Sequence, residues 1–286
     1  GLVARRALRE APAEEVWRQA WEAEDLWATD MHSIVKCGEG QPRFRLAYMP
    51  VRNRGEIPRL VLEEAGVCYE LEVIGFQVWK AMKLEMPFGK VPVLRDYDGQ
   101  GSDLAQECAI TRFLAQQVGL AGSTEAERAK VDMLYEQYWC TLRNNGISHD
   151  GEHYSARALR GAGAPGGPSY REMPRLNNFT RAERSRAALG VFEELLERSG
   201  TGFLVGASPT YVDLALFIEL VELSEENNAP DFAERLGLPR LGAFLEAMLA
   251  RPRLRAYLES PRRMPRYQRP QYVYIPGKYT PEVPGK

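Results

Sequence analysis

His149 and His153 are the residues whose types and spacing most directly suggest metal chemistry. They stand four apart with Asp150 and Glu152 between them, and imidazole and carboxylate groups are common ligands of divalent metals. Gly151 interrupts the helix that would bring both rings to one face, and the sequence places no other cysteine or histidine to complete a site. We therefore interpret the pair as solvated loop histidines and expect no metal.

Thiol chemistry is the second candidate. The four cysteines, Cys37, Cys68, Cys108 and Cys140, have neither metal-ligand nor redox spacing. A chain of 286 residues does not need a disulfide framework to fold. We therefore expect free thiols in a reducing intracellular compartment, and not a secreted protein.

The segment 43–119 alternates between strand and helix patterns. The predicted elements are, in order, a strand at Phe44–Tyr48, a helix at 54–66, a strand at 67–73, a strand through Val91-Pro92, a hairpin through 96–99 and a helix that begins at Glu107.

Residues 88–94 (Phe-Gly-Lys-Val-Pro-Val-Leu) and 104–110 (Leu-Ala-Gln-Glu-Cys-Ala-Ile) resemble the glutathione-binding edge of a glutathione S-transferase. The resemblance extends over about residues 43–260 and is closest to the sigma class, which uses a tyrosine. It implies an N-terminal thioredoxin-like domain of α/β type at 43–119, followed by an all-helical domain at 120–260. It also implies glutathione as substrate if the protein is active, and no cofactor otherwise.

The helical half carries a family motif of its own. Val205–Gly–Ala–Ser–Pro–Thr–Tyr–Val–Asp213 resembles the box that starts a central helix of that domain. Thr210 is expected to accept a backbone N–H, and Asp213 is expected to reach back to the cap. We interpret this box as a folding signal.

The resemblance assigns the catalytic role to Tyr48, which ends the first strand. In sigma-like enzymes this tyrosine donates a hydrogen bond to the glutathione sulfur, which favours the thiolate nucleophile. Arg54 matches an arginine of the loop after the tyrosine, where a structural or electrostatic role is implied.

The same resemblance implies a set of glutathione contacts. Trp79 and Lys83 would contact the glycyl end, where the lysine charge suits a carboxylate. Val91 would pair its main chain with the cysteinyl unit, held by Pro92 in the cis form. Gln106 would meet the γ-glutamyl group.

Glu107 departs from this pattern, because the family has a serine there that grips the γ-glutamyl carboxylate at a helix N-terminus. Two like charges about 4 Å apart at an effective dielectric near 20 repel by roughly 4 kcal/mol, so the sequence predicts weak glutathione binding or none. A carboxylate is also favoured at a helix N-terminus by about 0.3–1 kcal/mol, which would explain why the residue is tolerated.

A second departure concerns the partner subunit. In sigma-type dimers an acidic residue of the partner reaches the γ-glutamyl ammonium, and Trp139 and Cys140 occupy the matching positions here. If the register is shifted by one helical turn, Glu136 occupies the position of this acidic residue. A homodimer therefore stays open.

Two extensions lie outside the resemblance. Residues 12–36 are predicted as a helix in a separate extension at 1–42, and they contain Trp17, Trp21 and Trp27. This helix would pack on the protein's own helical domain or dock on a partner.

The tail at 261–286 has six prolines, four tyrosines and six basic residues against one acid. It is expected to be extended and to bind a protein partner. An insertion at 144–180, with a centre rich in glycine and proline, is predicted as a long surface loop.

Composition excludes several classes of function. The net charge of −2 gives no general attraction for nucleic acid, and no apolar run is long enough to span a bilayer. The basic segment Leu2–Arg9 lacks acids and resembles an organellar targeting segment as much as an ordinary basic arm. Mitochondrion, plastid and cytoplasm all stay open.

Two hypotheses follow. The first, which we favour from the sequence, is a transferase-like protein that is inactive or weakly active and serves as an accessory subunit of a larger assembly. The second is a working glutathione transferase or glutathione-dependent isomerase that uses Tyr48.

Overall fold

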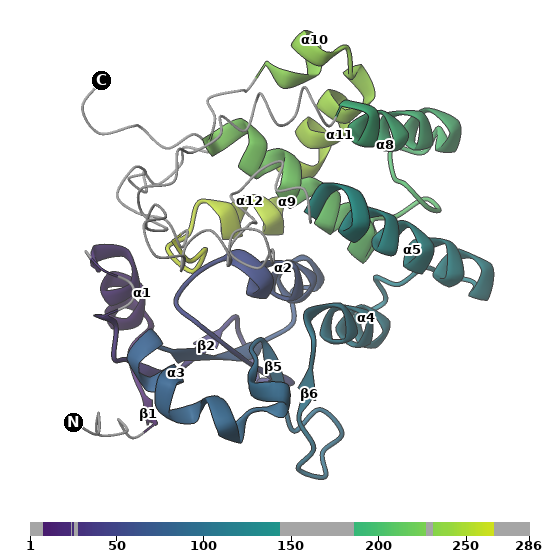
Figure 1. Cartoon of the computed structure of the whole chain (residues 1–286). Coiled ribbons are helices and arrows are strands. Elements are labelled where there is room, and N and C mark those ends of the chain that lie inside the picture. The colour runs from purple at the N-terminus through teal and green to yellow at the C-terminus, as the bar shows by residue number, and fades with distance from the viewer. Residues whose placement is uncertain (1–7, 24, 26–27, 144–185, 227–230, 266–286) are drawn as a thin grey trace, which may run out of the picture. The chain divides into compact units, whose positions relative to one another are not determined.

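The chain divides into two compact units (Figure 1). A computed structural model describes residues 8–23, 25, 28–143, 186–226 and 231–265. The first unit comprises the residues up to Leu120 together with the described residues from Arg251 onward, and the second comprises Ala121–Ala250. The predicted insertion at 144–180, its two histidines, Trp27 and the tail from residue 266 lie outside the described residues.

The first unit contains a six-stranded mixed sheet in the order β1-β2-β4-β3-β5-β6. Its strands are β1 (Arg9–Glu10), β2 (His32–Cys37), β3 (Phe44–Tyr48), β4 (Tyr69–Ile74), β5 (Val93–Arg95) and β6 (Leu104–Ala105). Strands β3 and β4 are parallel, whereas β5 pairs antiparallel with both β3 and β6.

Helices α2 (Glu56–Ala65) and α4 (Glu107–Val118) lie on one side of this sheet, and α3 (Phe76–Met82) lies on the other (Figure 1). The sheet residues Ala47, Ile74 and Val93 form a buried cluster with Val78 and Met82 of α3. The order β3-α2-β4-α3-β5-β6-α4 confirms the predicted thioredoxin-like domain.

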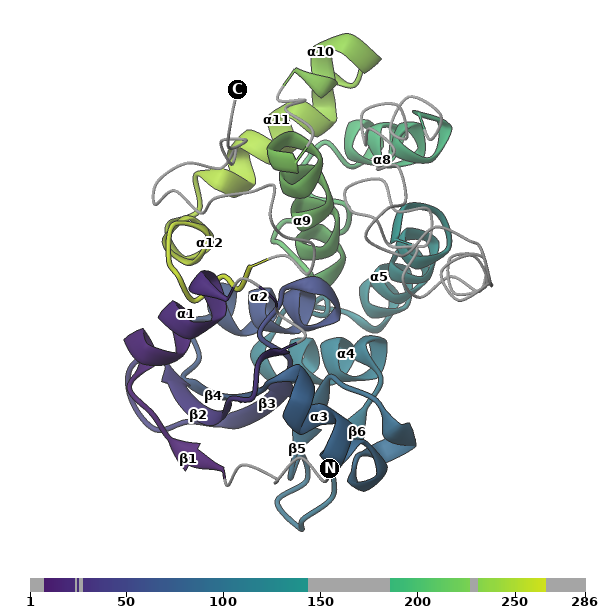
Figure 2. The same cartoon turned by 60° about the vertical axis from the view of Figure 1, so that its left-hand side comes forward.

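The N-terminal extension differs from its prediction, because residues 12–36 are not one helix. Among the described residues of this range, α1 (Ala13–Glu22) forms the α-helix, whereas β2 pairs antiparallel with β4 over its full length. The β-branched pair Ile34-Val35 suits a strand, and pairing with β4 offsets any helical preference of the segment. The extension is therefore part of the sheet (Figure 2).

The C-terminal segment also joins the first unit. Helix α12 (Pro252–Leu258), which the sequence assigns to the helical domain, contacts α2, and Arg253 Nη1 donates to the carbonyl of Glu64 at 3.0 Å. Trp21 of α1 donates its indole N–H to the carbonyl of Pro261 at 3.0 Å. The described parts of both extensions thus contact this chain's own first unit. The sequence instead predicts that the N-terminal extension contacts the helical domain or a partner, and that the tail contacts a partner.

The second unit is all-helical in its described residues, as predicted. Its elements are α5 (Glu125–Tyr138), the π-helix η5 (Trp139–Arg143), α8 (Arg186–Ser199), α9 (Tyr211–Glu226), α10 (Phe232–Leu236) and α11 (Pro239–Leu249). Asp213 reaches back as expected and accepts the N–H groups of Leu204 and Thr210, both at 2.8 Å. The Thr210 hydroxyl, however, donates to Asp213 at 2.7 Å. None of the described helices combines the length and apolar character needed to cross a membrane.

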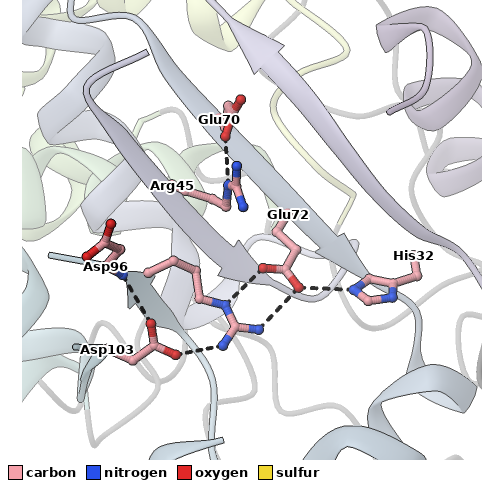
Figure 3. A network of polar contacts seen from close by, with 7 residues as sticks. His32, Arg45, Glu70, Glu72, Asp96 and Asp103 are labelled. Atoms are coloured by element: carbon pink, nitrogen blue, oxygen red, sulfur yellow. Dashed lines mark hydrogen bonds and ion pairs between the residues drawn. The ribbon is translucent and has the colours of Figure 1, made fainter. Parts of the chain in front are cut away.

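A network of ion pairs crosses the sheet of the first unit from β2 to β5 (Figure 3). Arg95 donates to both oxygens of Glu72, at 2.9 and 3.2 Å, and to Asp103 at 2.7 Å. His32 Nε2 lies 3.0 Å from Glu72 and donates to this carboxylate, which can only accept. Burial raises the pKa of Glu72, but the hydrogen bonds from His32 and Arg95 outweigh it and lower the pKa to about 2.

Val35→Asn tests whether β2 belongs to the fold. Val35 is 1% exposed, so the substitution buries an amide in an apolar site and is expected to lower the free energy of unfolding by about 3–5 kcal/mol. The neighbouring Lys36 is exposed, and Lys36→Asn should change it by less than about 1 kcal/mol. Denaturant titration of the two full-length variants measures this difference. If a protein that lacks residues 1–39 were as stable as the full chain, β2 would not be part of the fold.

The Glu72 carboxylate gives the unfolding free energy a defined pH dependence. Its pKa lies at about 2 in the folded protein, against an ordinary value of 4.5, so its ionised form stabilises the fold above pH 4.5. This contribution, about 3 kcal/mol, is lost as the pH falls from 4.5 to 2.

Glu72→Gln should therefore be less stable than the wild type at pH 7. The difference in unfolding free energy should shrink as the pH falls from 4.5 to 2. The control Glu70→Gln removes a more exposed carboxylate of the same strand, which pairs with Arg45 at 2.7 Å, and should cost less than about 1 kcal/mol. Chemical denaturation from pH 2 to 7 gives both curves. An equal, pH-independent loss in the two variants would contradict the assignment.

Candidate functional site

Tyr48, the predicted catalytic residue, ends β3 and is 1% exposed. Its ring belongs to a buried cluster with Val51 and Phe76, against which Val91 packs. Its hydroxyl oxygen accepts the backbone N–H of Arg54 at 3.1 Å. Because this bond uses a lone pair of the oxygen, the hydroxyl retains its own hydrogen as a donor.

A buried arginine fixes the loop between Tyr48 and α2. Arg59 is 0% exposed, and its Nη2 donates to the carbonyls of Val51 and Arg52 at 3.0 and 3.1 Å and to Glu56 at 2.7 Å. These bonds hold the loop that presents the Arg54 N–H to Tyr48. Arg59 was not among the predicted site residues, although its spacing of three from Glu56 is a signal for a helical ion pair.

The predicted glutathione contacts of the strand edge lie close together. The Val91-Pro92 peptide is cis, as the resemblance implied. Val91 packs against the cluster that contains Tyr48 and also against the cluster between the sheet and α3. Trp79 packs against the cluster between the sheet and α3. Lys83 is exposed, and its side chain runs past Gly89, two residues before Val91.

Gln106 precedes α4 with a backbone conformation that non-glycine residues rarely adopt, φ 73° and ψ 118°. It directly follows Ala105, which pairs with Val93 of β5, the residue after Pro92. Such a conformation costs on the order of 1–3 kcal/mol and persists where the surrounding structure requires it. The strand edge and the start of α4 are therefore held together as one backbone arrangement.

Glu107 is the first residue of α4 and is 3% exposed. Its Oε1 accepts the hydroxyl of Thr111 at 3.0 Å, and its Oε2 lies 3.7 Å from the thiol of Cys108. The carboxylate is thus hydrogen-bonded one turn along its own helix. Thr111 was not among the predicted site residues.

In sigma-type dimers an acidic residue of the second subunit reaches the glutathione site, and the positions of this chain that match that residue lie in the helical unit. Trp139 is 8% exposed, whereas Cys140 and Glu136 are exposed on the same side of the helix. Which of them meets another subunit stays a prediction.

The described residues offer neither a metal site nor a reactive disulfide. Among those residues, no group of three or more histidines, cysteines and acids is arranged to hold a metal ion. All four cysteines are free, and burial raises the pKa of Cys37 to about 12. A thiol with this pKa is not a nucleophile near neutral pH.

The chain is similar in sequence to known proteins. The family described as "Glutathione S-transferase, C-terminal domain" matches residues 170–261. "Glutathione S-transferase 1" of Ascaris suum is 33% identical over 194 residues, which cover 67% of this chain and 84% of that protein. The chain belongs to the glutathione S-transferase family.

Solved structures agree on the fold. A Nu-class enzyme from Haemonchus contortus has a TM-score of 0.58 at 27% identity and covers 76% of this chain and 96% of its own. The sigma-class enzyme of Fasciola hepatica has a TM-score of 0.56 at 26% identity and covers 76% and 98%. Since two classes match to a similar extent, the sigma-like assignment stays a prediction.

Gly55→Ala tests whether the Tyr48 ring needs the space beside the start of α2. Gly55 has φ −83° and ψ −10°, which alanine adopts without strain, but a Cβ there would lie 2.5 Å from Cδ1 of Tyr48. The ring must move, and we expect a loss of about 1–3 kcal/mol in the free energy of unfolding.

The matched control is Gly190→Ala in α8, where an added Cβ meets nothing within 4 Å. It should leave stability unchanged or raise it by up to about 1 kcal/mol. Thermal unfolding compares the two, and equal stability of both variants would show that the Tyr48 ring has room to spare.

Proposed function

We propose that the protein is a glutathione transferase in which Tyr48 donates a hydrogen bond to the sulfur of bound glutathione. The observation that carries the proposal is the bond from the Arg54 N–H to the Tyr48 oxygen at 3.1 Å, which orients the hydroxyl and leaves it able to donate. A hydrogen bond to a thiolate in a buried site lowers the pKa of the thiol. The thiol proton leaves to solvent, and the thiolate sulfur bonds to an electrophilic carbon. That carbon either expels its leaving group with the bonding electron pair or, in an addition to a double bond, passes the π electron pair to the neighbouring atom, which takes a proton from solvent.

Backbone features of the binding edge support the same proposal. The main chain of Val91 remains the proposed contact of the cysteinyl unit, and the unusual conformation of Gln106 would direct this residue and the start of α4 to the γ-glutamyl end. Trp79 and Lys83 remain the proposed contacts of the glycyl end.

A second candidate is the weakly active accessory subunit that the sequence favours. Glu107 supports it, because a carboxylate stands where the family's serine binds an anion. The bond from Trp21 of α1 to the carbonyl of Pro261 favours a role of these described parts in the chain's own fold, while the predicted partner contacts of the tail from residue 266 lie outside the described residues. Retention on immobilised glutathione, with elution by free glutathione, separates the two candidates.

Tyr48→Phe tests the proposed role of the hydroxyl. The lost hydrogen bond to a charged sulfur is worth about 1.5–3 kcal/mol, so kcat should fall about 10- to 100-fold while the Kd for glutathione changes little. The pH profile of kcat/KM should also move to higher pH, because the thiol of bound glutathione regains a higher pKa. Steady-state assays with a generic aromatic electrophile measure these effects.

Tyr97→Phe is the control, because Tyr97 is 36% exposed and lies in the hairpin between β5 and β6. It should behave like the wild type. An unchanged rate and pH profile in Tyr48→Phe would contradict the proposed role. Failure of the wild type to bind glutathione at all would support the accessory subunit.

A further inference from the structure

The loop between Tyr48 and α2 presents the Arg54 N–H to the Tyr48 oxygen from an unusual backbone conformation. Asn53, directly before Arg54, has φ 34°, in the left-handed region that residues other than glycine rarely adopt. Such a conformation persists only where the surrounding contacts hold it. The direction of the Arg54 N–H therefore depends on the side chains that fix this loop.

A single nitrogen of Arg59 fixes one side of the loop. Its Nη2 carries two hydrogens, yet it serves three acceptors: the carbonyls of Val51 and Arg52, at 3.0 and 3.1 Å, and Glu56 Oε2 at 2.7 Å. At least one hydrogen is therefore shared between two acceptors. A shift of the Glu56 carboxylate changes the share that the two carbonyls receive, so the position of Glu56 is linked to the loop.

Tyr257 of α12 fixes the Glu56 carboxylate. Helix α12 contacts α2 (Figure 1), and the Tyr257 hydroxyl donates to the same Glu56 Oε2 at 3.0 Å. Among the described residues, Glu56 accepts hydrogen bonds from Arg59 and Tyr257, while the Arg263 guanidinium lies 3.7 Å from Oε1. Glu56 is 2% exposed and Tyr257 is 0% exposed, so solvent does not replace a lost donor. Without the hydroxyl, the carboxylate is drawn toward Arg263 and away from Arg59.

We propose that Tyr257 is a positioning residue for the hydroxyl of Tyr48. It fixes the Glu56 carboxylate and, through this carboxylate, Arg59. Arg59 in turn keeps the Arg54 N–H directed at the Tyr48 oxygen. This inference rests on the proposed function, because the orientation of the hydroxyl affects turnover only if Tyr48 donates to the glutathione sulfur.

A main-chain contact of the same C-terminal segment limits how far the loop can move. The N–H of Arg52 donates to the carbonyl of Pro265 at 3.0 Å. This bond does not involve the Tyr257 hydroxyl and stays in place when the hydroxyl is removed. Tyr257→Phe is therefore expected to loosen the loop without releasing it.

The expected magnitude follows from that of Tyr48→Phe, which removes the whole hydrogen bond to the sulfur. If loosening the loop loses about half of that free energy, the fold-change is the square root, so Tyr257→Phe should lower kcat about three- to tenfold. The pH profile of kcat/KM should move to higher pH, as in Tyr48→Phe, while the Kd for glutathione changes little. Burial raises the pKa of Tyr257 well above its ordinary value, so this hydroxyl does not itself titrate in the assay.

The test is a cycle of the wild type, Tyr257→Phe, Tyr48→Phe and the double variant. Steady-state kinetics over a range of pH are combined with the ultraviolet absorbance of the thiolate of bound glutathione. Because Tyr257 acts through Tyr48, its substitution should lower kcat and the thiolate absorbance in the wild type. It should have no further effect in the Tyr48→Phe background.

Tyr69→Phe is the matched control. Tyr69 is 2% exposed and donates to Glu63 Oε1 at 3.0 Å, so it also bonds a glutamate of α2, two turns from Glu56. Its substitution removes the same kind of bond away from the loop and should leave kcat and the pH profile unchanged. Thermal unfolding verifies that each variant is folded at the assay temperature. Glu56→Gln, which keeps the shape of the acceptor but not its charge, replaces Tyr257→Phe if that variant does not fold.

The outcomes separate the inference from the proposed function. An unchanged kcat and pH profile in Tyr257→Phe, beside an impaired Tyr48→Phe, overturns the inference alone. A loss that persists in the Tyr48→Phe background, or an equal loss in Tyr69→Phe, indicates a general effect on the fold and also rejects the inference. If Tyr48→Phe keeps the wild-type rate and pH profile, or if the wild type does not bind glutathione, both the proposed function and the inference are wrong.

Discussion

The buried pair of Arg59 and Glu56 is the interaction on which the arrangement around Tyr48 depends. Arg59 is 0% exposed and Glu56 is 2% exposed, and Tyr257 of α12 donates to the same Glu56 oxygen at 3.0 Å. Removing one partner of such a pair leaves a buried charge and costs about 3–5 kcal/mol, so the pair is strongly constrained. Through it, the loop after Tyr48, the start of α2 and the C-terminal segment are held as one body.

The N-terminal and C-terminal extensions also contact the sheet and the residues around Tyr48 within the first unit. Strand β2 covers the edge of β4, and Ala23, just after α1, packs against the cluster that contains Tyr48. On the C-terminal side, the N–H of Arg52 donates to the carbonyl of Pro265 at 3.0 Å. Described residues on both the N-terminal and the C-terminal side of the domain therefore reach the surroundings of Tyr48. The thioredoxin-like domain of this protein is larger than the 43–119 segment that resembles the family.

Glu107 shows how a family pattern and a particular chain differ. The residue type alone predicts repulsion of an anionic ligand, and this prediction assumes that the charge stands at the helix end. In the structure this carboxylate is buried and accepts the hydroxyl of Thr111 on the same helix. The electrostatic effect of a side chain depends on where its charged atoms lie, and a position in a motif does not give this.

The sequence by itself determined the elements whose signals are local. Strand β3 at Phe44–Tyr48, the start of α4 at Glu107 and the cis Val91-Pro92 peptide are as predicted, because alternation, helix signals and a familiar motif act over a few residues. Only the tertiary structure decided that residues 32–37 form a strand, since their partner lies about forty residues away in β4. It also decided the direction of the Glu107 carboxylate and the burial of Arg59, because these depend on contacts between side chains that neither composition nor periodicity records.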